Sequence, residues 1–211
     1  MFESVMDKLS QIRILPVLVL ERAEDALPLA QALKAGGLPC AEVTFRTAAA
    51  EAALREIARD RDILLGAGTV LQPDQVDKAI SAGAKFIVTP GFNLRVVQRC
   101  QERAVPVFQG VATPTEIQMA LEAGVEVVKF FPAESLGGIK ALRAIAAPYS
   151  MIRFIPTGGI GSDKLAEYLA FKAVVAVGGS WMVAPELVKT RNFTEVTRLA
   201  AQAVAMVART A

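Results

Sequence analysis

The stretch VPVFQGVATPTEIQMALEAGVEVVKFF, residues 105–131, contains two short apolar runs separated by a helical segment. The runs VPVFQG (105–110) and VEVVKFF (125–131) have the composition and length of β-strands. Between them, Thr113 and Glu116 form a Thr-x-x-Glu pattern, which is typical of a helix N-terminus. The stretch therefore predicts one strand–helix–strand unit, as found in parallel sheets.

Units of this kind repeat along the chain. One further helix is predicted to begin at Thr47, and another has Pro73 in its first turn. Ala-Gly pairs at 35–36, 82–83 and 123–124 mark helix ends, because glycine there can adopt the left-handed conformation. We expect eight strands, at residues 12–20, 40–46, 63–70, 85–90, 105–110, 125–131, 151–157 and 173–179.

Eight strands that alternate with helices predict the fold class. The pattern fits an α/β protein of the (β/α)₈ TIM-barrel type, with residues 2–11 as an extra N-terminal helix and residues 1–211 as a single domain. A doubly wound open sheet is the alternative. It usually has fewer strands, and no G-x-G-x-x-G fingerprint follows the first strand here.

Composition limits the partners and the location. A net charge of +2 over 211 residues gives no footprint for nucleic acid or an anionic membrane. The longest apolar run, at 14–20, is too short to span a bilayer, and the charged start does not resemble a signal peptide. Two cysteines, Cys40 and Cys100, are too few for a disulfide framework. We expect a cytoplasmic protein that acts on a small molecule.

The absence of histidine narrows the chemistry. The chain has none, which excludes Ser-His-Asp and Cys-His catalysis within it and removes the commonest ligand of a catalytic transition metal. Acid–base chemistry must therefore depend on carboxylates, lysine, tyrosine or water. We expect no metal site.

Two predicted strands carry polar side chains toward the barrel interior. Side chains alternate along a strand, so Glu42, Thr44 and Arg46 share one face while the apolar residues between them face the helices. The same alternation points Lys129 inward, late in its strand. The late ends of strands hold the chemistry of barrel enzymes, so these residues are candidates for the site.

The lysine has two interpretations. Lys129 and Glu42 can form a structural ion pair in the barrel interior. Alternatively, burial favours the neutral amine, which attacks a carbonyl to form a Schiff base while the nearby carboxylate moves protons. The residues alone leave both interpretations open.

Glycine-rich segments follow the last two strands. TGGIGS occupies residues 157–162 and GGSW occupies 178–181. Barrels often bind phosphate with the loops after strands seven and eight, where backbone N–H groups approach the anion. Each Gly-Gly pair can also be a tight turn, but the two together indicate a phosphorylated ligand.

The motifs together resemble a known family. GLPCAEVTFR (37–46) and GVEVVKFFPAESLGG (124–138) are similar to two distinctive segments of the 2-keto-3-deoxy-6-phosphogluconate (KDPG) / 4-hydroxy-2-oxoglutarate (KHG) aldolases. GAGTVL, TPG, PTGGI and GGSW, which begin at residues 66, 89, 156 and 178, follow in the same order. The resemblance covers nearly the whole chain.

The resemblance implies a role for each candidate residue. It makes Lys129 the Schiff-base lysine and Glu42 the general acid and base. Arg46 and Thr69 would hold the carboxylate of the pyruvate portion. The remaining implied substrate contacts are Pro90 and Phe131 around the pyruvate, and Thr157, Gly158, Gly159, Gly179 and Ser180, of which the last four bind the distal phosphate.

The resemblance also implies the reaction. A class I aldolase would cleave KDPG to pyruvate and glyceraldehyde 3-phosphate with no cofactor or metal, and would form a homotrimer. Three alternatives stay open: a sibling aldolase for the galactonate epimer or mainly for KHG, a phosphate-binding isomerase without a Schiff base, and a non-catalytic phosphosugar-binding barrel.

Overall fold

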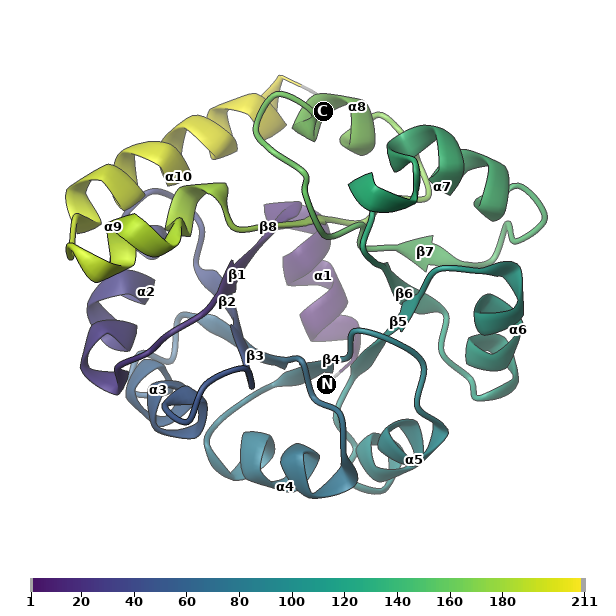
Figure 1. Cartoon of the computed structure of the whole chain (residues 1–211), viewed down its shortest axis with the longest axis horizontal. Helices are drawn as coiled ribbons and strands as arrows, with labels where there is room; N and C mark the ends of the chain where they lie inside the picture. Colours follow the sequence, from purple (N-terminus) through teal and green to yellow (C-terminus); the bar gives the residue numbers. More distant parts are fainter. Residues whose placement is uncertain (1, 210–211) are drawn as a thin grey trace.

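Eight parallel strands form a barrel inside a ring of helices (Figure 1). The computed structural model describes residues 2–209. Hydrogen-bonded neighbours follow the order β7-β6-β5-β4-β3-β2-β1-β8, and isolated bridges from Phe154 to Val174 and from Thr157 to Gly178 join the last two strands. The strands are β1 (Ile14–Leu18), β2 (Cys40–Thr44), β3 (Leu64–Gly68), β4 (Phe86–Val88), β5 (Val107–Val111), β6 (Val127–Phe130), β7 (Arg153–Phe154) and β8 (Val177–Gly179). The predicted (β/α)₈ barrel is confirmed.

Helices cover the outside of the barrel. No helix in residues 2–209 is long and apolar enough to cross a membrane. The α-helices are α1 (Phe2–Ile12), α2 (Ala26–Ala35), α3 (Ala50–Ile57), α4 (Pro73–Ser81), α5 (Leu94–Glu102), α6 (Pro114–Glu122), α7 (Gly138–Ala146), α8 (Leu165–Leu169), α9 (Pro185–Lys189) and α10 (Phe193–Ala208). The short 3₁₀ turns are η1 (Ala23–Asp25), η2 (Glu134–Leu136) and η3 (Trp181–Val183).

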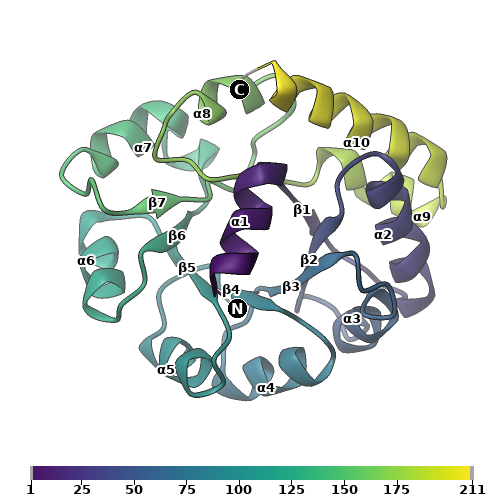
Figure 2. The ribbon, with the colours of Figure 1, turned by 180° about the vertical axis from the view of Figure 1, so that it is seen from behind.

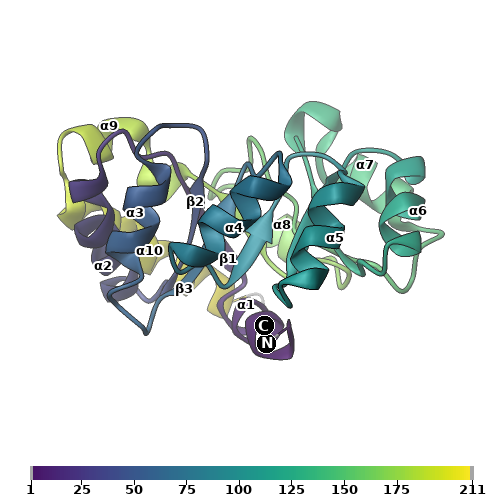
Figure 3. The same ribbon diagram turned by 90° about the horizontal axis from the view of Figure 1, so that it is seen from below.

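The extra helix α1 lies across one end of the barrel (Figures 2 and 3). Its Val5 and Leu9 are buried in one apolar cluster with Leu15, Leu64 and other residues near the starts of the strands. The helix therefore seals the N-terminal end of the barrel. The opposite end, where the strands finish, is the one that carries the candidate site.

The alternation of side chains agrees with the sequence prediction. Ala41 and Val43 of β2, and Val128 of β6, pack with the helices in the outer apolar cluster. Cys40 and Val127, which have the opposite parity on the same two strands, belong to the inner cluster. Glu42 and Lys129 share the inner parity, so both side chains enter the barrel as predicted.

Two of the three predicted helix starts are confirmed. Pro73 is the first residue of α4, and Thr113 and Glu116 form a capping box before α6. The start at Thr47 is wrong, because α3 begins at Ala50. The Thr47 hydroxyl instead donates a hydrogen bond of 2.5 Å to the carbonyl of Leu20, so it ties the loop after β2 to the neighbouring strand connection.

The predicted glycine ends are confirmed at two helices and shifted at the third. Gly83 and Gly124 have φ angles of 107° and 74°, in the left-handed region. Gly36 has a φ of −81°, and the left-handed residue is Gly37, with a φ of 88°. The chain therefore turns one residue later after α2 than the Ala-Gly pattern predicts.

The strands lie where the sequence places them, but all eight are shorter. The largest difference is in the seventh strand, predicted at 151–157, of which β7 keeps Arg153 and Phe154. Pro156 lacks a backbone N–H and cannot donate toward β8, whereas Ile155 N and Thr157 N still donate to Val128 O and Phe130 O on the β6 side, at 2.8 and 2.9 Å. Thr157 then meets Gly178 in an isolated bridge, and this short contact positions the glycine-rich loop that follows.

Candidate active site

Lys129 and Glu42 meet in the barrel interior. They belong to β6 and β2, which are four strands apart in the eight-stranded barrel and therefore face each other across it. Lys129 Nζ donates a hydrogen bond of 3.2 Å to Glu42 Oε1, and the two side chains are 7% and 1% exposed. Removing an ion pair from water to this degree costs desolvation free energy. The pair therefore fits a functional site better than a contact that only stabilises the fold.

The surroundings of the pair are mainly apolar. Lys129 Nζ lies 5.2 Å from the centroid of the Phe131 ring, close enough for a cation–π contact. Phe131 is half-buried just after β6. The inner apolar cluster also includes Val127, two residues before Lys129 on the same strand face. A carbonyl carbon that reaches Lys129 would therefore react in a place with little water.

A glycine on β3 provides the space for the carboxylate. A Cβ atom at Gly68 would lie 2.0 Å from Glu42 Oε1, which is far inside van der Waals contact. Gly68 is paired in register with Thr44, the residue two positions after Glu42 on β2. Sequence reasoning did not single out Gly68, although a glycine at the end of a predicted strand is a known sign of close approach.

One oxygen of Glu42 is free to act. Oε2 is buried and has no hydrogen-bond partner among the described residues, while Oε1 accepts from Lys129. A buried acceptor without a donor is rare, because leaving it unsatisfied costs about 1–3 kcal/mol. A substrate hydroxyl or a water placed beside Oε2 would supply that donor, and its proton could pass to the carboxylate.

A cavity of about 430 Å³ opens at the ends of the strands. It brings together residues from both glycine-rich segments, from the loop after β2 and from the end of β6. The predicted site residues that line it are Arg46, Phe131, Thr157, Gly158, Gly159, Gly179 and Ser180. Arg46 is exposed and lies two residues beyond β2, so its guanidinium is reached from solvent rather than buried in the interior.

Thr69 and Pro90 follow the neighbouring strands β3 and β4 and, like the deeper Glu42 and Lys129, do not line this cavity. Thr69 has a φ of 55°, which is an outlier for a β-branched residue and the kind of strain found at functional sites. The loop at Pro90 is held by Thr89, whose hydroxyl accepts from Gly110 N at 3.0 Å and donates to Gly91 O at 2.8 Å. The two hydrogen bonds of Thr89 therefore hold the backbone around Pro90.

The cysteines do not compete with Lys129 as nucleophiles. Cys40 and Cys100 are both buried and free. Burial raises the pKa of Cys100 to about 12, and burial also raises the pKa of Cys40 strongly. Neither thiol forms a thiolate near neutral pH, and the thiolate is the reactive form.

The chain is similar to known proteins over nearly its whole length. Residues 5–199 match the family of KDPG and KHG aldolases. The chain belongs to the KDPG and KHG aldolase family. Among the curated family members, the 2-dehydro-3-deoxy-phosphogluconate aldolase of Treponema pallidum is 50% identical over 205 residues, which cover 97% of this chain and 98% of that protein.

Solved structures of KDPG aldolases have the same fold. The Legionella pneumophila KDPG aldolase, with pyruvate captured at low pH as a covalent carbinolamine intermediate, has a TM-score of 0.90 and 40% identity, covering 94% of this chain and 97% of that one. The Zymomonas mobilis KDPG aldolase, solved with 3-phosphoglycerate, has a TM-score of 0.90 and 36% identity, covering 95% of each chain.

Part of the lining of the cavity in this aldolase was not predicted from the sequence. Trp181, Ile160, Gly161 and Val17 also line the 430 Å³ cavity. Trp181 belongs to the quoted GGSW segment, so the motif contained a signal for it. A Cβ at Gly179 would lie 1.9 Å from the Trp181 ring, so the glycine is needed for the indole to lie against the strand end.

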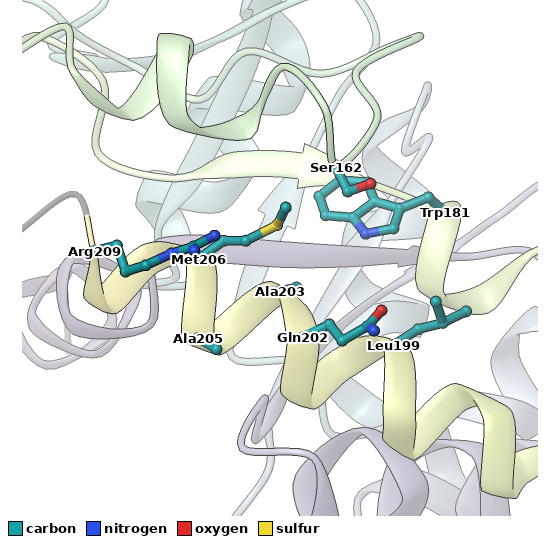
Figure 4. Close-up of a pocket in the computed structure, with 8 residues that line it drawn as sticks. All are labelled: Ser162, Trp181, Leu199, Gln202, Ala203, Ala205, Met206 and Arg209. Carbon is teal, nitrogen blue, oxygen red and sulfur yellow. The ribbon is translucent and has the colours of Figure 1, made fainter.

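Trp181 also lines a second cavity of about 410 Å³ (Figure 4). The second cavity lies along α10, where Leu199, Met206 and Arg209 line it, and Ser162 borders it beside the indole. None of the predicted site residues lines it.

Within residues 2–209, no group of three or more Cys, Asp or Glu side chains has the arrangement to hold a metal ion.

Proposed function

We propose that this chain is a class I aldolase, which cleaves KDPG to pyruvate and glyceraldehyde 3-phosphate through an imine on Lys129. It also cleaves KHG to pyruvate and glyoxylate, because the pyruvate half of the two substrates is the same. The observation that carries the proposal is the buried 3.2 Å contact between Lys129 Nζ and Glu42 Oε1 inside a barrel of this family.

The reaction begins with attack by the neutral amine of Lys129 on the C2 ketone of the substrate. The C2–N bond forms, the carbonyl oxygen takes up a proton from solvent, and the carbinolamine loses water to give an iminium ion. The carbinolamine captured in the Legionella relative supports this first step. Glu42 lies within hydrogen-bond distance of Nζ, so it can take the proton that the amine releases and return it to the departing hydroxyl.

Bond cleavage then uses the iminium ion as the electron acceptor. Glu42, directly or through a water, removes the proton from the C4 hydroxyl. The C3–C4 bond breaks, its electron pair forms an enamine, and C4 leaves as the aldehyde carbon of glyceraldehyde 3-phosphate. Protonation at C3 and hydrolysis of the imine release pyruvate and restore Lys129. The unpaired Oε2 of Glu42 is the acceptor available for these transfers.

The substrate is held at its two ends. Arg46 and Thr69 hold the carboxylate beside C2, since the planar fork of arginine donates parallel hydrogen bonds to a carboxylate. Pro90 and Phe131 shape the pocket around the pyruvate carbons. The distal phosphate binds to the loops at Gly158, Gly159, Gly179 and Ser180, with Thr157 at their base; the 3-phosphoglycerate in the Zymomonas relative supports a phosphorylated ligand.

The remaining properties come from the family. We propose that the enzyme is a cytoplasmic homotrimer that needs no cofactor, because the imine on Lys129 takes the place of a Lewis acid as the electron acceptor. Its partner is the small-molecule substrate, and a role with nucleic acid or membranes is not proposed.

The proposal is tested by borohydride reduction in the presence of pyruvate. Reduction of an imine fixes the pyruvate carbons to the lysine, and peptide mapping then locates the modification. We expect the label on the peptide that contains Lys129. A label on Lys85 or Lys140 would assign the imine to another lysine. No label in a folded protein would favour a non-catalytic binding role.

The phosphate end is tested by Ser180→Ala. The hydroxyl is expected to donate to the phosphate, and a hydrogen bond to a charged group contributes about 1.5–3 kcal/mol. The loss in kcat/KM on KDPG should therefore be roughly ten- to a hundredfold. Cleavage of unphosphorylated KHG should be nearly unchanged, because that substrate has no phosphate to accept the hydrogen bond. The measurement is kcat/KM for both substrates.

Ser162→Ala is the matched control for this variant. Ser162 borders the second cavity and is exposed, so its replacement should leave kcat/KM on both substrates unchanged. If Ser180→Ala lowered kcat/KM equally on KDPG and KHG, Ser180 would support the site as a whole and the phosphate assignment would fail.

A further inference from the structure

The loop that carries Gly158 and Gly159 is tied to the segment that follows Lys129. Ala133 N donates to Thr157 O at 2.8 Å, and Glu134 N donates to Gly158 O at 3.0 Å. Both donors lie at the start of η2, a few residues after Lys129 on the same segment. The first end of the loop is therefore fixed to the strand that carries the imine lysine.

The far end of the loop is held by the side chain of the same glutamate. Tyr168 OH donates to Glu134 Oε1 at 2.6 Å, and Lys164 Nζ donates to Glu134 Oε2. Lys164 immediately precedes α8, and Tyr168 is buried within that helix. The hydrogen bond from Lys164 has the larger effect and that from Tyr168 the smaller. Together they lower the pKa of Glu134 below its ordinary value of 4.5, so the carboxylate is charged at neutral pH.

Close packing leaves the loop little freedom. Gly158 and Gly159 have φ angles of 106° and 77°, which other residues rarely adopt. A Cβ at Gly159 would lie 2.9 Å from Glu134 Cβ, and one at Gly158 would lie 3.1 Å from Pro132 Cα. The backbone of the loop therefore lies directly against η2, and Glu134 contacts it at both ends.

We propose that Glu134, Lys164 and Tyr168 form a clamp that sets the enzyme's preference for keto acids with a distal phosphate. The proposal rests on the proposed function, in which Lys129 binds C2 and the glycine loop binds the phosphate. The substrate has a fixed covalent length between these two points. Both can be bound at once only when the loop is held at the matching distance from Lys129, and an anion site made of backbone N–H groups depends on a rigid loop.

None of the three residues lines the 430 Å³ cavity, and their side chains bond to one another, so they act through the loop and not on the substrate. They are positioning residues. A substrate without a phosphate, such as KHG, is held by its pyruvate half and gives the glycine loop no phosphate to bind, so it should not respond to the clamp. This difference separates a role in selectivity from a general role in stability.

The test uses Glu134→Gln, Lys164→Met and Tyr168→Phe, each of which keeps the size of the side chain. We expect each variant to lower kcat/KM on KDPG about tenfold, mainly through KM, because a charge-assisted or buried hydrogen bond is weakened. Cleavage of KHG should change less than about twofold. Inorganic phosphate, measured as a competitive inhibitor of KDPG cleavage, should bind more weakly by a similar factor to the loss on KDPG.

Two control variants accompany these. Lys140→Met removes an exposed lysine of α7 and should leave kcat/KM on KDPG and on KHG unchanged. Lys164→Arg keeps the charge and should restore most of the preference for KDPG. Thermal unfolding of every variant fixes the assay temperature at which all of them are folded.

The outcomes separate the clamp from the reaction itself. An equal loss on KDPG and KHG, or unchanged phosphate inhibition in all three variants, would overturn the clamp while borohydride trapping of pyruvate at Lys129 would still support the aldolase. Failure of the unmodified protein to trap pyruvate would remove the proposed function, and the clamp proposal with it. A selective loss on KDPG with intact trapping would support both.

Discussion

Lys129→Arg is expected to abolish cleavage of KDPG and KHG, with a loss in kcat/KM of at least about 10⁴-fold. Arginine remains protonated in proteins, so it cannot provide the neutral amine that attacks the ketone. The substitution keeps a positive charge opposite Glu42, which the parent places 3.2 Å from Lys129 Nζ, and so it tests the nucleophile without leaving a buried carboxylate unpaired. The measurement is kcat/KM on both substrates, with borohydride trapping of pyruvate.

Lys85→Arg is the matched control, because Lys85 is exposed and immediately precedes β4, at the other end of the barrel from the site. It should retain the parent's activity and trapping. Lys129→Met should be as inactive as Lys129→Arg but less stable, since removal of one partner of a buried ion pair costs about 3–5 kcal/mol. If Lys129→Arg kept kcat/KM within about tenfold of the parent, the reaction would not pass through an imine on this residue.

Much of the site follows from strand periodicity. Glu42 and Lys129 were predicted to point inward because side chains alternate, and the barrel then places β2 opposite β6. Their contact is thus a consequence of local pattern and of the number of strands. The caps at Pro73 and Thr113 were predictable for the same reason, since each depends on residues within one turn of a helix.

The features that sequence reasoning missed depend on contacts between distant segments. Thr47 has the residue type of a helix cap, but its hydroxyl bonds to Leu20 instead, a choice made by the packing of two loops. Glu134 was part of a quoted motif, yet its partners Lys164 and Tyr168 lie 30 and 34 residues later. No spacing rule connects these positions.

The backbone strain at Thr69 could not be predicted from the sequence either. Thr69 was singled out only through the resemblance, and nothing in its residue type indicates a left-handed φ of 55°. A β-branched residue is disfavoured in that conformation, so a sequence-based rule predicts the reverse. The conformation of Thr69 depends on the neighbouring strand. Val70 N donates a hydrogen bond to Val88 O, which holds the chain after β3 against β4.

Glu42→Gln should separate imine formation from proton transfer. The amide has nearly the size of the carboxylate and can still meet Lys129, but it cannot accept the C4 hydroxyl proton. General acid–base catalysis contributes about 10²–10⁴-fold, so cleavage of KDPG and exchange of the C3 protons of pyruvate should both fall by a factor in that range. Borohydride should still trap some pyruvate at Lys129. The measurements are kcat/KM, the rate of C3 exchange in deuterated water, and the extent of trapping.

Glu122→Gln, at an exposed position on α6, is the matched control and should leave exchange and cleavage unchanged. The position of the Glu42 carboxylate makes the comparison informative. Oε1 accepts a hydrogen bond from Lys129, and Oε2 is buried without a partner in the described part of the chain, so Oε2 is free to meet the substrate or a water. If C3 exchange in Glu42→Gln matched that of the parent, another group would carry the proton, and Glu42 would serve only to hold Lys129 in place.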